Sequence, residues 1–406
     1  MLALDLLPHS LTLGAVLVIV LKVLVVFVLG LVGTMLMVWF ERKMISGMQN
    51  RIGPNKAGPF GILQTLADGV KLFFKEDLIP EKSDRLVFKL APYLAFVPAF
   101  VVWSVIPLGG DFSNGKDGSF SIFGHKTWMQ LADPPAGVLL LLALSSIAVY
   151  GIMLAGWSSG SKYPLLGSVR ASAQMISYEA ALGLSMATVI LISGTLSTHG
   201  IVASQLSLSR WHLIATGILP FVVFLVAATA ELNRPPFDLV EAEQELVGGF
   251  NTEYSSIRFA LFFLAEFMNT ITMSGVIVTL FFGGPQPVRF TLGSFHFSGD
   301  LHLGAFTGVV WFLLKLVVFL YIYVWFRGTL PRLRYDQLMN LGWKVMIPVA
   351  LAWFMLLAAF RIGDDRSWNN WAVGLVGLAV ILAGGWLLGR ANRVAHRNRE
   401  REGAMF

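Results

Sequence analysis

The chain has 406 residues, a formal net charge of +6 and no cysteine; 56% of its residues are hydrophobic and 13% are charged. This composition is typical of proteins that cross a membrane several times. The absence of cysteine excludes disulfides and Cys-ligated iron–sulfur clusters, and the seven histidines fall in expected loops, tails or helix ends, where no pair could hold a membrane haem. We therefore expect that this chain carries no electrons itself.

Apolar stretches of about 20 residues, the length that crosses a hydrocarbon core, predict an all-α, polytopic transmembrane helix bundle. We expect about nine spans, at residues 13–40, 86–107, 136–157, 174–193, 213–232, 256–282, 305–326, 345–361 and 370–389. The first stretch is longer than the apolar region of a removable signal peptide. Most lysines and arginines outside the spans lie in alternate loops, which predicts an outer N-terminus and a cytoplasmic C-terminus. Topology thus accounts for the basic charge, without nucleic acid.

The first predicted inner loop, residues 41–85, has the composition of a structured segment. Gly53-Pro54 and Gly58-Pro59 interrupt any continuous helix and demand a defined turn. From Phe60 to Phe74 the apolar residues recur at three- and four-residue spacing, which predicts an amphipathic helix in the membrane interface. An amphiphile with a polar ring and a long apolar tail could enter between this helix and the spans. The alternative is a simple surface anchor.

A second unusual segment, residues 231–254, places acidic residues between two apolar spans. They are Glu231, Asp238, Glu241, Glu243, Glu245 and Glu253. If residues 238–246 are helical, Asp238, Glu241 and Glu245 share one face. Carboxylates so close together cannot all ionise cheaply, so the segment favours proton uptake. The alternative is a solvated acidic surface that docks a basic partner.

Charged residues also fall within the predicted spans. Glu179 and Glu231 lie near the inner ends of their spans, whereas Glu266 and Lys315 lie near the centre of spans that run in opposite directions. Because charges are costly in lipid, we expect Glu266 and Lys315 to face one another as a pair. That pair is either structural or passes charge displacement to a neighbouring subunit.

Four stretches match one known family. Residues 41–80, with Glu-Arg-Lys and Met-Gln-x-Arg-x-Gly-Pro-Asn, residues 173–179, residues 231–254 and residues 331–339 resemble signatures of the quinone-site membrane subunit of respiratory complex I. In bacteria this family comprises the H subunits of NADH:quinone oxidoreductase, and the resemblance extends over roughly residues 10–361. It divides the chain into a family-like domain of eight spans, 1–361, and an additional ninth span with a basic cytoplasmic tail, 362–406. Ile52 departs from the basic residue expected at its position.

The resemblance implies a quinone chamber closed by peripheral subunits. The quinone-binding residues would be Arg42, Gln49, Arg51, Asp68, Arg332 and Arg334. For each arginine the alternative is a lipid-phosphate anchor or an ion pair with Glu41 or Asp336. The proton-transfer residues would be Glu179, Glu231, Asp238, Glu241, Glu243, Glu245, Glu253, Glu266 and Lys315.

The resemblance also implies the surroundings of the chain. The substrate would be menaquinone or ubiquinone, with no covalently bound cofactor here and with FMN and iron–sulfur clusters in partner subunits. The expected partners are the peripheral quinone-site and iron–sulfur subunits, small membrane subunits, antiporter-like subunits and lipids, in a bacterial inner membrane. The rival functions are the related membrane subunit of a hydrogenase or other donor:quinone complex and a stand-alone cation/proton antiporter. The chain has no visible internal repeat, which argues against the antiporter.

Overall fold

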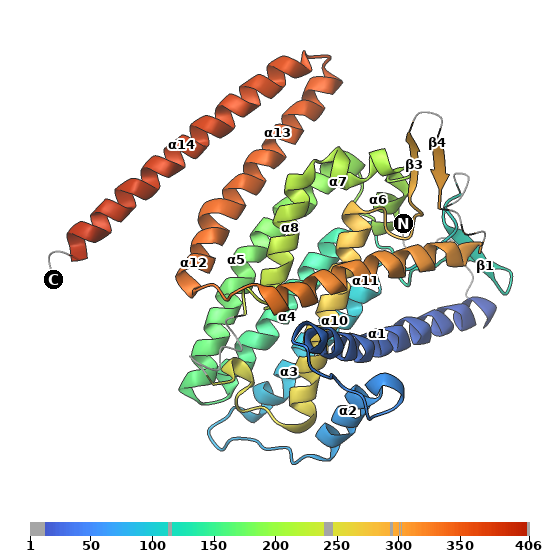
Figure 1. Ribbon diagram of the computed structural model, residues 1–406, viewed down its shortest axis with the longest axis vertical. Coiled ribbons are helices and arrows are strands. Elements are labelled where there is room, and N and C mark those ends of the chain that lie inside the picture. Colours follow the sequence, from blue (N-terminus) through green and yellow to red (C-terminus); the bar gives the residue numbers. More distant parts are fainter. Residues whose placement is uncertain are drawn as a thin grey trace. The chain divides into compact units, whose positions relative to one another are not determined.

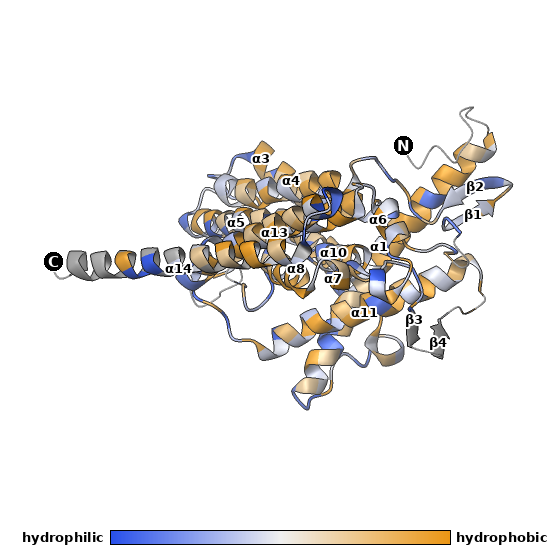
Figure 2. Cartoon of the chain, turned by 90° about the horizontal axis from the view of Figure 1, so that it is seen from above, coloured by the Kyte–Doolittle hydropathy of each residue, from blue (hydrophilic) through white to orange (hydrophobic). Residues whose placement is uncertain are grey.

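The computed structural model describes residues 13–112, 116–238, 247–292, 295–299, 301 and 303–403. Over these residues the chain is mainly helical, and apolar residues dominate the helices (Figures 1 and 2). The all-α bundle predicted from sequence is therefore confirmed. Two short antiparallel hairpins, β1–β2 and β3–β4, are the strands that the structure adds.

The elements follow in chain order. They are α1 (Leu13–Met48), η2 (Pro59–Gly61), α2 (Gln64–Phe74), α3 (Arg85–Trp103), β1 (Ser119–Ile122), β2 (His125–Trp128), α4 (Gly137–Ser158), α5 (Lys162–Ser193), α6 (Thr198–Ser204), η4 (Leu208–Arg210), α7 (His212–Ala215), α8 (Ile218–Glu231), η5 (Gly249–Asn251), α10 (Ser256–Phe281), β3 (Arg289–Leu292), β4 (Phe295–Ser298), α11 (Ala305–Thr329), α12 (Tyr335–Leu341), the π-helical turn η6 (Gly342–Met346), α13 (Ile347–Asp365) and α14 (Asn370–Gly403). The chain forms two compact units, residues 1–347 and 348–406.

Within the described residues, seven helical segments are long and apolar enough to cross a membrane. They are Leu13–Met48, Arg85–Trp103, Gly137–Ser158, Lys162–Ser193, Ser256–Phe281, Ala305–Thr329 and Tyr335–Asp365. The span expected at 213–232 is divided at Gly217, whose φ is 79°, into α7 and the 14-residue helix α8. The ninth expected span lies within α14. A multi-pass membrane bundle is confirmed, while the count of nine spans stays a prediction.

One predicted loop is wrong. Residues 158–173 were expected to connect two spans, but α5 already begins at Lys162. Its first turns pack closely on protein: a Cβ added to Gly156 would lie 2.3 Å from the carbonyl oxygen of Pro164, and one added to Gly167 would lie 2.8 Å from Gly249. Hydropathy identifies segments that face lipid, so it missed helical turns that small residues bury against neighbours.

Helix α10 forms the core of the first unit. In its apolar stretch 72% of the residues are buried, whereas in that of α1 only 22% are. Helices α1, α3 and α11 contact α10 directly. The side chain of Asp84 caps α3 by accepting hydrogen bonds from the backbone N–H groups of Leu86 and Val87, at 3.1 and 3.3 Å. A buried α10 flanked by α1 and the loop after α8 is what positions the charged residues described next.

Candidate functional site

Helix α2 confirms the amphipathic helix predicted in the first long loop, although the α-helix begins at Gln64 rather than at Phe60. The turn before it needs left-handed backbone at Gly58, with φ 71°, and at Phe60, with φ 55°. No residue of α2 is buried in this chain, and its apolar side chains Leu66, Val70, Phe73 and Phe74 are more than half exposed. The helix therefore presents an apolar face that the chain itself does not cover.

A cavity of about 260 Å³ lies between α1, α2 and α10. Its walls are almost entirely apolar, and Thr34, Thr65 and Gly69 are the exceptions to a lining of aliphatic and aromatic side chains. The lining residues are Leu31, Val32, Thr34, Met35, Val38, Thr65, Leu66, Gly69, Phe263, Leu264 and Phe267. Ligand pockets commonly combine such apolar walls with a few placed polar groups.

The polar residues expected around this helix divide into two groups. Arg42 and Asp68 form an ion pair at 2.6 Å that joins the end of α1 to α2. Gln49 and Arg51 are exposed in the turn that follows α1, together with Ile52. The structure thus places Arg42 and Asp68 beside the cavity-forming helix, and Gln49 and Arg51 on an open surface.

The arginines after α11 also have acidic partners. Arg332 pairs with the buried Asp238 at 3.0 Å, and Arg334 pairs with Asp336 at 3.2 Å between two exposed side chains. For Arg334 the ion-pair alternative raised by the sequence is therefore realised. Glu41, the other acid considered as a partner, is bound by different arginines.

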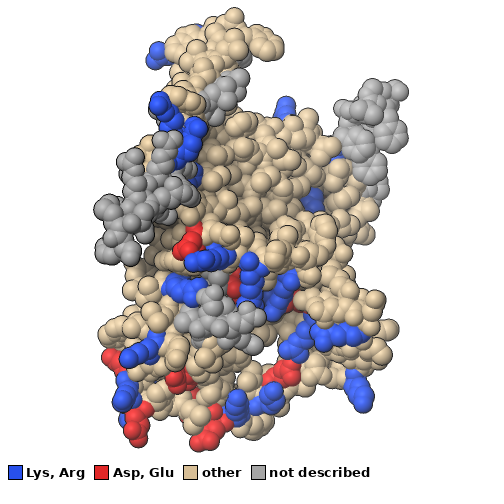
Figure 3. Space-filling model, turned by 60° about the vertical axis from the view of Figure 1, so that its left-hand side comes forward, with Lys and Arg blue, Asp and Glu red and all other residues tan. Residues whose placement is uncertain are grey.

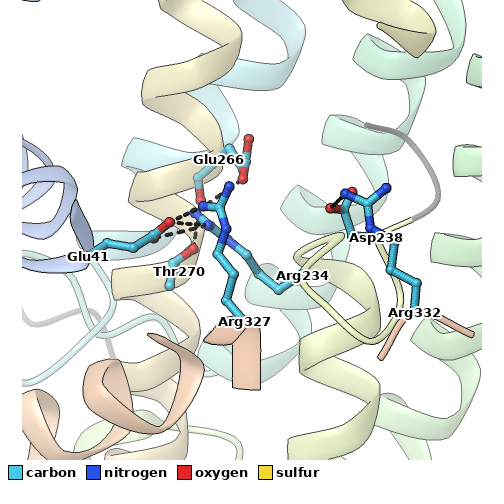
Figure 4. A network of polar contacts seen from close by, with 7 residues as sticks. All are labelled: Glu41, Arg234, Asp238, Glu266, Thr270, Arg327 and Arg332. Atoms are coloured by element: carbon cyan, nitrogen blue, oxygen red, sulfur yellow. Dashed lines mark hydrogen bonds and ion pairs between the residues drawn. The ribbon is translucent and has the colours of Figure 1, made fainter. Parts of the chain in front are cut away.

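Glu41 is the centre of a buried charged cluster that sequence reasoning missed (Figure 4). Its carboxylate accepts hydrogen bonds from Arg234 at 3.0 and 3.1 Å and from Arg327, and Arg234 also pairs with Glu266 at 3.1 Å. The side chains of Arg234 and Glu41 are 4% and 7% exposed. The cluster joins α1, the loop after α8, α10 and α11, and its two carboxylates balance its two guanidinium groups. Arg234 stood within the acidic segment, but neither spacing nor hydropathy indicates which distant acid it meets.

The expected pairing of Glu266 with Lys315 is wrong. The Lys315 ammonium donates hydrogen bonds to the carbonyl oxygens of Phe282, Gly284 and Gln286, at 2.7, 2.9 and 2.7 Å, and lies 4.8 Å from the Trp211 ring centroid. Phe282 follows Glu266 by 16 residues along the same helix, a distance of roughly 24 Å at the α-helical rise. The buried ammonium is satisfied by carbonyls where α10 ends, while Arg234 neutralises Glu266.

One carboxylate, that of Glu231, lies in the interior of the bundle beside two small cavities. Glu231 is buried and lines two cavities of about 60 and 20 Å³, and the described residues offer its Oε2 atom no hydrogen-bond partner. Asn251 Oδ1 and Thr272 Oγ1, which line one cavity each, also lack a protein partner among those residues. Both volumes suffice for water, which would satisfy these atoms.

Two adjacent serines of α4 lie close to Glu231 and Glu179, one beside each acid. Ser145 lines the smaller cavity with Glu231, and the Ser146 hydroxyl donates a hydrogen bond to Glu179 Oε1. Glu179 is half-buried on α5. The structure therefore places a serine hydroxyl of α4 next to each of the two carboxylates predicted from sequence.

The rest of the acidic segment is described in part. Glu241, Glu243 and Glu245 lie outside the described residues, so their expected common face with Asp238 stays a prediction. Glu253 is half-buried in the turn between η5 and α10. The start of the segment is held by Gln174, whose Nε2 donates to the carbonyl oxygens of Ala230 and Phe237 at 2.7 and 2.9 Å.

Charged side chains gather on one part of the molecular surface. In the face that Figure 3 shows, the red side chains and most of the blue ones lie in the lower half of the view, below a largely uncharged surface. Among the described residues, no group of three or more His, Cys, Asp or Glu side chains could hold a metal ion.

Comparison with known proteins gives one consistent result. The sequence model of the NADH dehydrogenase family matches residues 21–358. The H subunit of NADH-quinone oxidoreductase from Frankia casuarinae is 51% identical over 372 residues, which cover 90% of this chain and 78% of that protein. Its namesake from Streptomyces avermitilis is 47% identical over 375 residues, covering 91% and 78%. The chain therefore belongs to the NADH dehydrogenase family, among the H subunits of the NADH-quinone oxidoreductases.

Proposed function

We propose that the chain forms the membrane wall of the quinone site of an NADH-quinone oxidoreductase and begins its proton path. The observation that carries the proposal is the apolar cavity between α1, α2 and α10. A quinone needs an apolar passage for its tail and a few polar groups for its ring. A cavity of about 260 Å³ with one wall on an interfacial helix offers the passage.

The ring of Phe267 separates the cavity from the charged cluster. Phe267 lines the cavity, and the Arg234 guanidinium lies 4.6 Å from the centroid of its ring. Arg42 and Asp68 pair where α1 and α2 approach one another. A quinone ring at the inner end of the passage would thus lie near guanidinium and carboxylate groups, which suits a substrate that gains negative charge when it is reduced.

The proton path would begin with the carboxylates. Quinone reduction takes up two protons for two electrons, so charge arriving at the ring favours proton movement through nearby acids. Glu266 lines the same cavity of about 60 Å³ as Glu231, and adjacent serines relate Glu231 to Glu179. Water in these cavities would complete a series of titratable and hydroxyl groups through the interior. Asp238, Glu253 and the undescribed acids Glu241, Glu243 and Glu245 would supply the entrance.

The electron carriers belong to other chains of the complex. The substrate is menaquinone or ubiquinone, and FMN belongs to a partner subunit. The iron–sulfur clusters belong to partner subunits because this chain has no cysteine to ligate a cluster. Its partners are the peripheral quinone-site, small membrane and antiporter-like subunits. The distribution of basic residues favours an outer N-terminus, and the additional span with its basic tail favours a bacterial inner membrane.

A thiol placed in the cavity tests the proposal. Gly69 lines the cavity, and a Cβ added there meets no atom within 4 Å, so Gly69→Cys should fit without displacing a neighbour. Because the chain has no other cysteine, a bulky maleimide would label one position in it. We expect labelling of the purified complex to abolish inhibitor-sensitive NADH:quinone activity, with electron transfer from NADH to a water-soluble acceptor unchanged.

The matched control is Gly385→Cys on α14, another helical glycine with open space around its Cβ position. Labelled Gly385→Cys should keep its activity. Full quinone reduction by the labelled Gly69→Cys complex would refute the assignment of this cavity.

A further inference from the structure

The C-terminal end of α2 is attached to the start of α10 by a set of contacts between residues that do not line the cavity. The Ser256 hydroxyl lies within hydrogen-bonding distance of the carbonyl oxygens of Leu72 and Lys75, at 3.1 and 2.9 Å. These carbonyls belong to the last turn and C-cap of α2, where backbone acceptors have no partner within the helix. Ser256 therefore caps α2 from another part of the chain.

Two neighbouring residues extend this attachment to the loop that follows α2. The Ser255 hydroxyl donates to the carbonyl oxygen of Glu76 at 3.1 Å and accepts from the backbone N–H of Leu78 at 3.0 Å. Arg258 forms an ion pair with Asp77 at 2.9 Å, and its side chain is 14% exposed. We call Ser255, Ser256 and Arg258 the α2 latch.

The residue that precedes the latch is packed firmly against α3. Tyr254 precedes it and stacks on Phe88 of α3, with ring centroids 4.1 Å apart and planes at 6°. The Tyr254 hydroxyl donates to the carbonyl oxygen of Phe88, and burial raises the pKa of Tyr254 to about 12, so the ring stays neutral and anchored. Since α2 buries none of its own residues, its position depends on polar contacts, which are the Arg42–Asp68 ion pair along the helix and the contacts that hold its two ends. At its other end, Trp39 donates to the carbonyl oxygen of Phe60 at 2.9 Å.

We propose that the α2 latch sets the position of α2 over the apolar cavity and so determines how tightly the site binds the tail of its quinone. The inference rests on the proposed function, because it takes the cavity as the tail passage. Releasing the latch lets the C-terminal end of α2 move away from α10, while the Arg42–Asp68 ion pair still joins α2 to α1. A long tail then loses apolar contact with Leu66 and with the rest of this wall, whereas a ring without a tail loses nothing there.

The test compares two substrates in the assembled, purified complex. The variants are Ser256→Ala, which keeps a Cβ at φ 55°, and Asp77→Asn, which removes the ion pair from its exposed side. Loss of one such hydrogen bond corresponds to about a three- to tenfold change in binding. We expect KM for a decyl-substituted benzoquinone to rise by about that factor, with KM for the same ring without a tail and both kcat values unchanged.

Three controls accompany the test. Ser83→Ala removes a hydroxyl that bonds the carbonyl oxygen of Pro80, farther along the same loop but outside the latch. Asp117→Asn removes an exposed ion pair beside the β1–β2 hairpin. Neither should change the ratio of the two KM values. Arg258→Lys should keep the wild-type ratio of the two KM values because a lysine can still pair with Asp77. Arg258→Gln should change this ratio because it cannot form that ion pair.

The outcomes separate the two proposals. Parallel changes for both quinones, or an unchanged ratio in Ser256→Ala and Asp77→Asn, would overturn the latch. If labelled Gly69→Cys still reduces quinone, the cavity assignment fails. If that label blocks activity while the latch variants keep the wild-type ratio, only the latch is refuted.

Discussion

The buried charged cluster around Glu41 gives the most quantitative prediction. Replacing Arg234 by glutamine removes the guanidinium that contacts both Glu41 and Glu266, at 3.0 and 3.1 Å. Breaking a buried ion pair by removing one partner costs about 3–5 kcal/mol, because the remaining charge is left uncompensated. Arg327 remains on Glu41 and its side chain is 35% exposed, so we expect the lower end of that range, about 3 kcal/mol.

The assay is the half-life of inhibitor-sensitive NADH:quinone activity when the purified complex is held at a fixed elevated temperature, with the amount of each subunit measured beside it. A loss of about 3 kcal/mol corresponds to roughly a 100-fold larger population of the opened cluster. We therefore expect the half-life of Arg234→Gln to fall by more than about tenfold, even if only part of the loss acts on the rate of opening.

A double-mutant cycle separates pairing from general damage. Glu41→Gln alone leaves two arginines without their shared acid, whereas Glu41→Gln with Arg234→Gln leaves one arginine and one glutamate. The loss of stability in the double variant should be smaller than the sum of the two single losses by about 2 kcal/mol. Lys126→Gln, which removes an exposed pair with Asp117, should behave as wild type. Single variants with wild-type half-lives, or strictly additive losses, would refute the reasoning.

Two further substitutions test carboxylate and ammonium roles. Glu231→Gln should leave assembly intact but reduce quinone reduction together with proton pumping in membrane vesicles, because the amide cannot exchange a proton with water in the two cavities it lines; an undiminished proton gradient would count against the relay. Lys315→Met should lower the amount of this chain in the assembled complex, since each buried carbonyl left unsatisfied costs about 1–3 kcal/mol. Normal assembly with selective loss of pumping would instead support the proton-transfer role predicted from sequence.

Sequence patterns predicted the features that depend on local chemistry. Apolar stretches indicated the bundle, and the spacing of apolar residues between Phe60 and Phe74 indicated α2, because lipid and interface select side chains at fixed periods. Gly-Pro pairs indicated the turn before it. The identification of Glu179 and Glu231 followed from the cost of charge in lipid, and the structure buries Glu231 and leaves Glu179 half-buried.

Pairings between distant residues were not predictable in the same way. Glu266 and Lys315 have complementary charges and comparable depths in the hydropathy profile, yet tertiary packing gives Glu266 an arginine and gives Lys315 three carbonyls. The sequence cannot indicate that α10 ends where Lys315 needs acceptors, since that depends on how α10 and α11 cross. The acids from Glu241 to Glu245 stay predictions.

Composition, period and motif were sufficient to identify the class of this protein, the family to which it belongs and the residue types that its interior must accommodate. Tertiary packing was needed to show which charges meet, where the apolar cavity lies beneath α2 and how Ser256 caps that helix from more than 180 residues away along the chain. The physical reason is that a buried charge or carbonyl accepts any partner of suitable chemistry, and only the packing of helices determines which partner comes within reach.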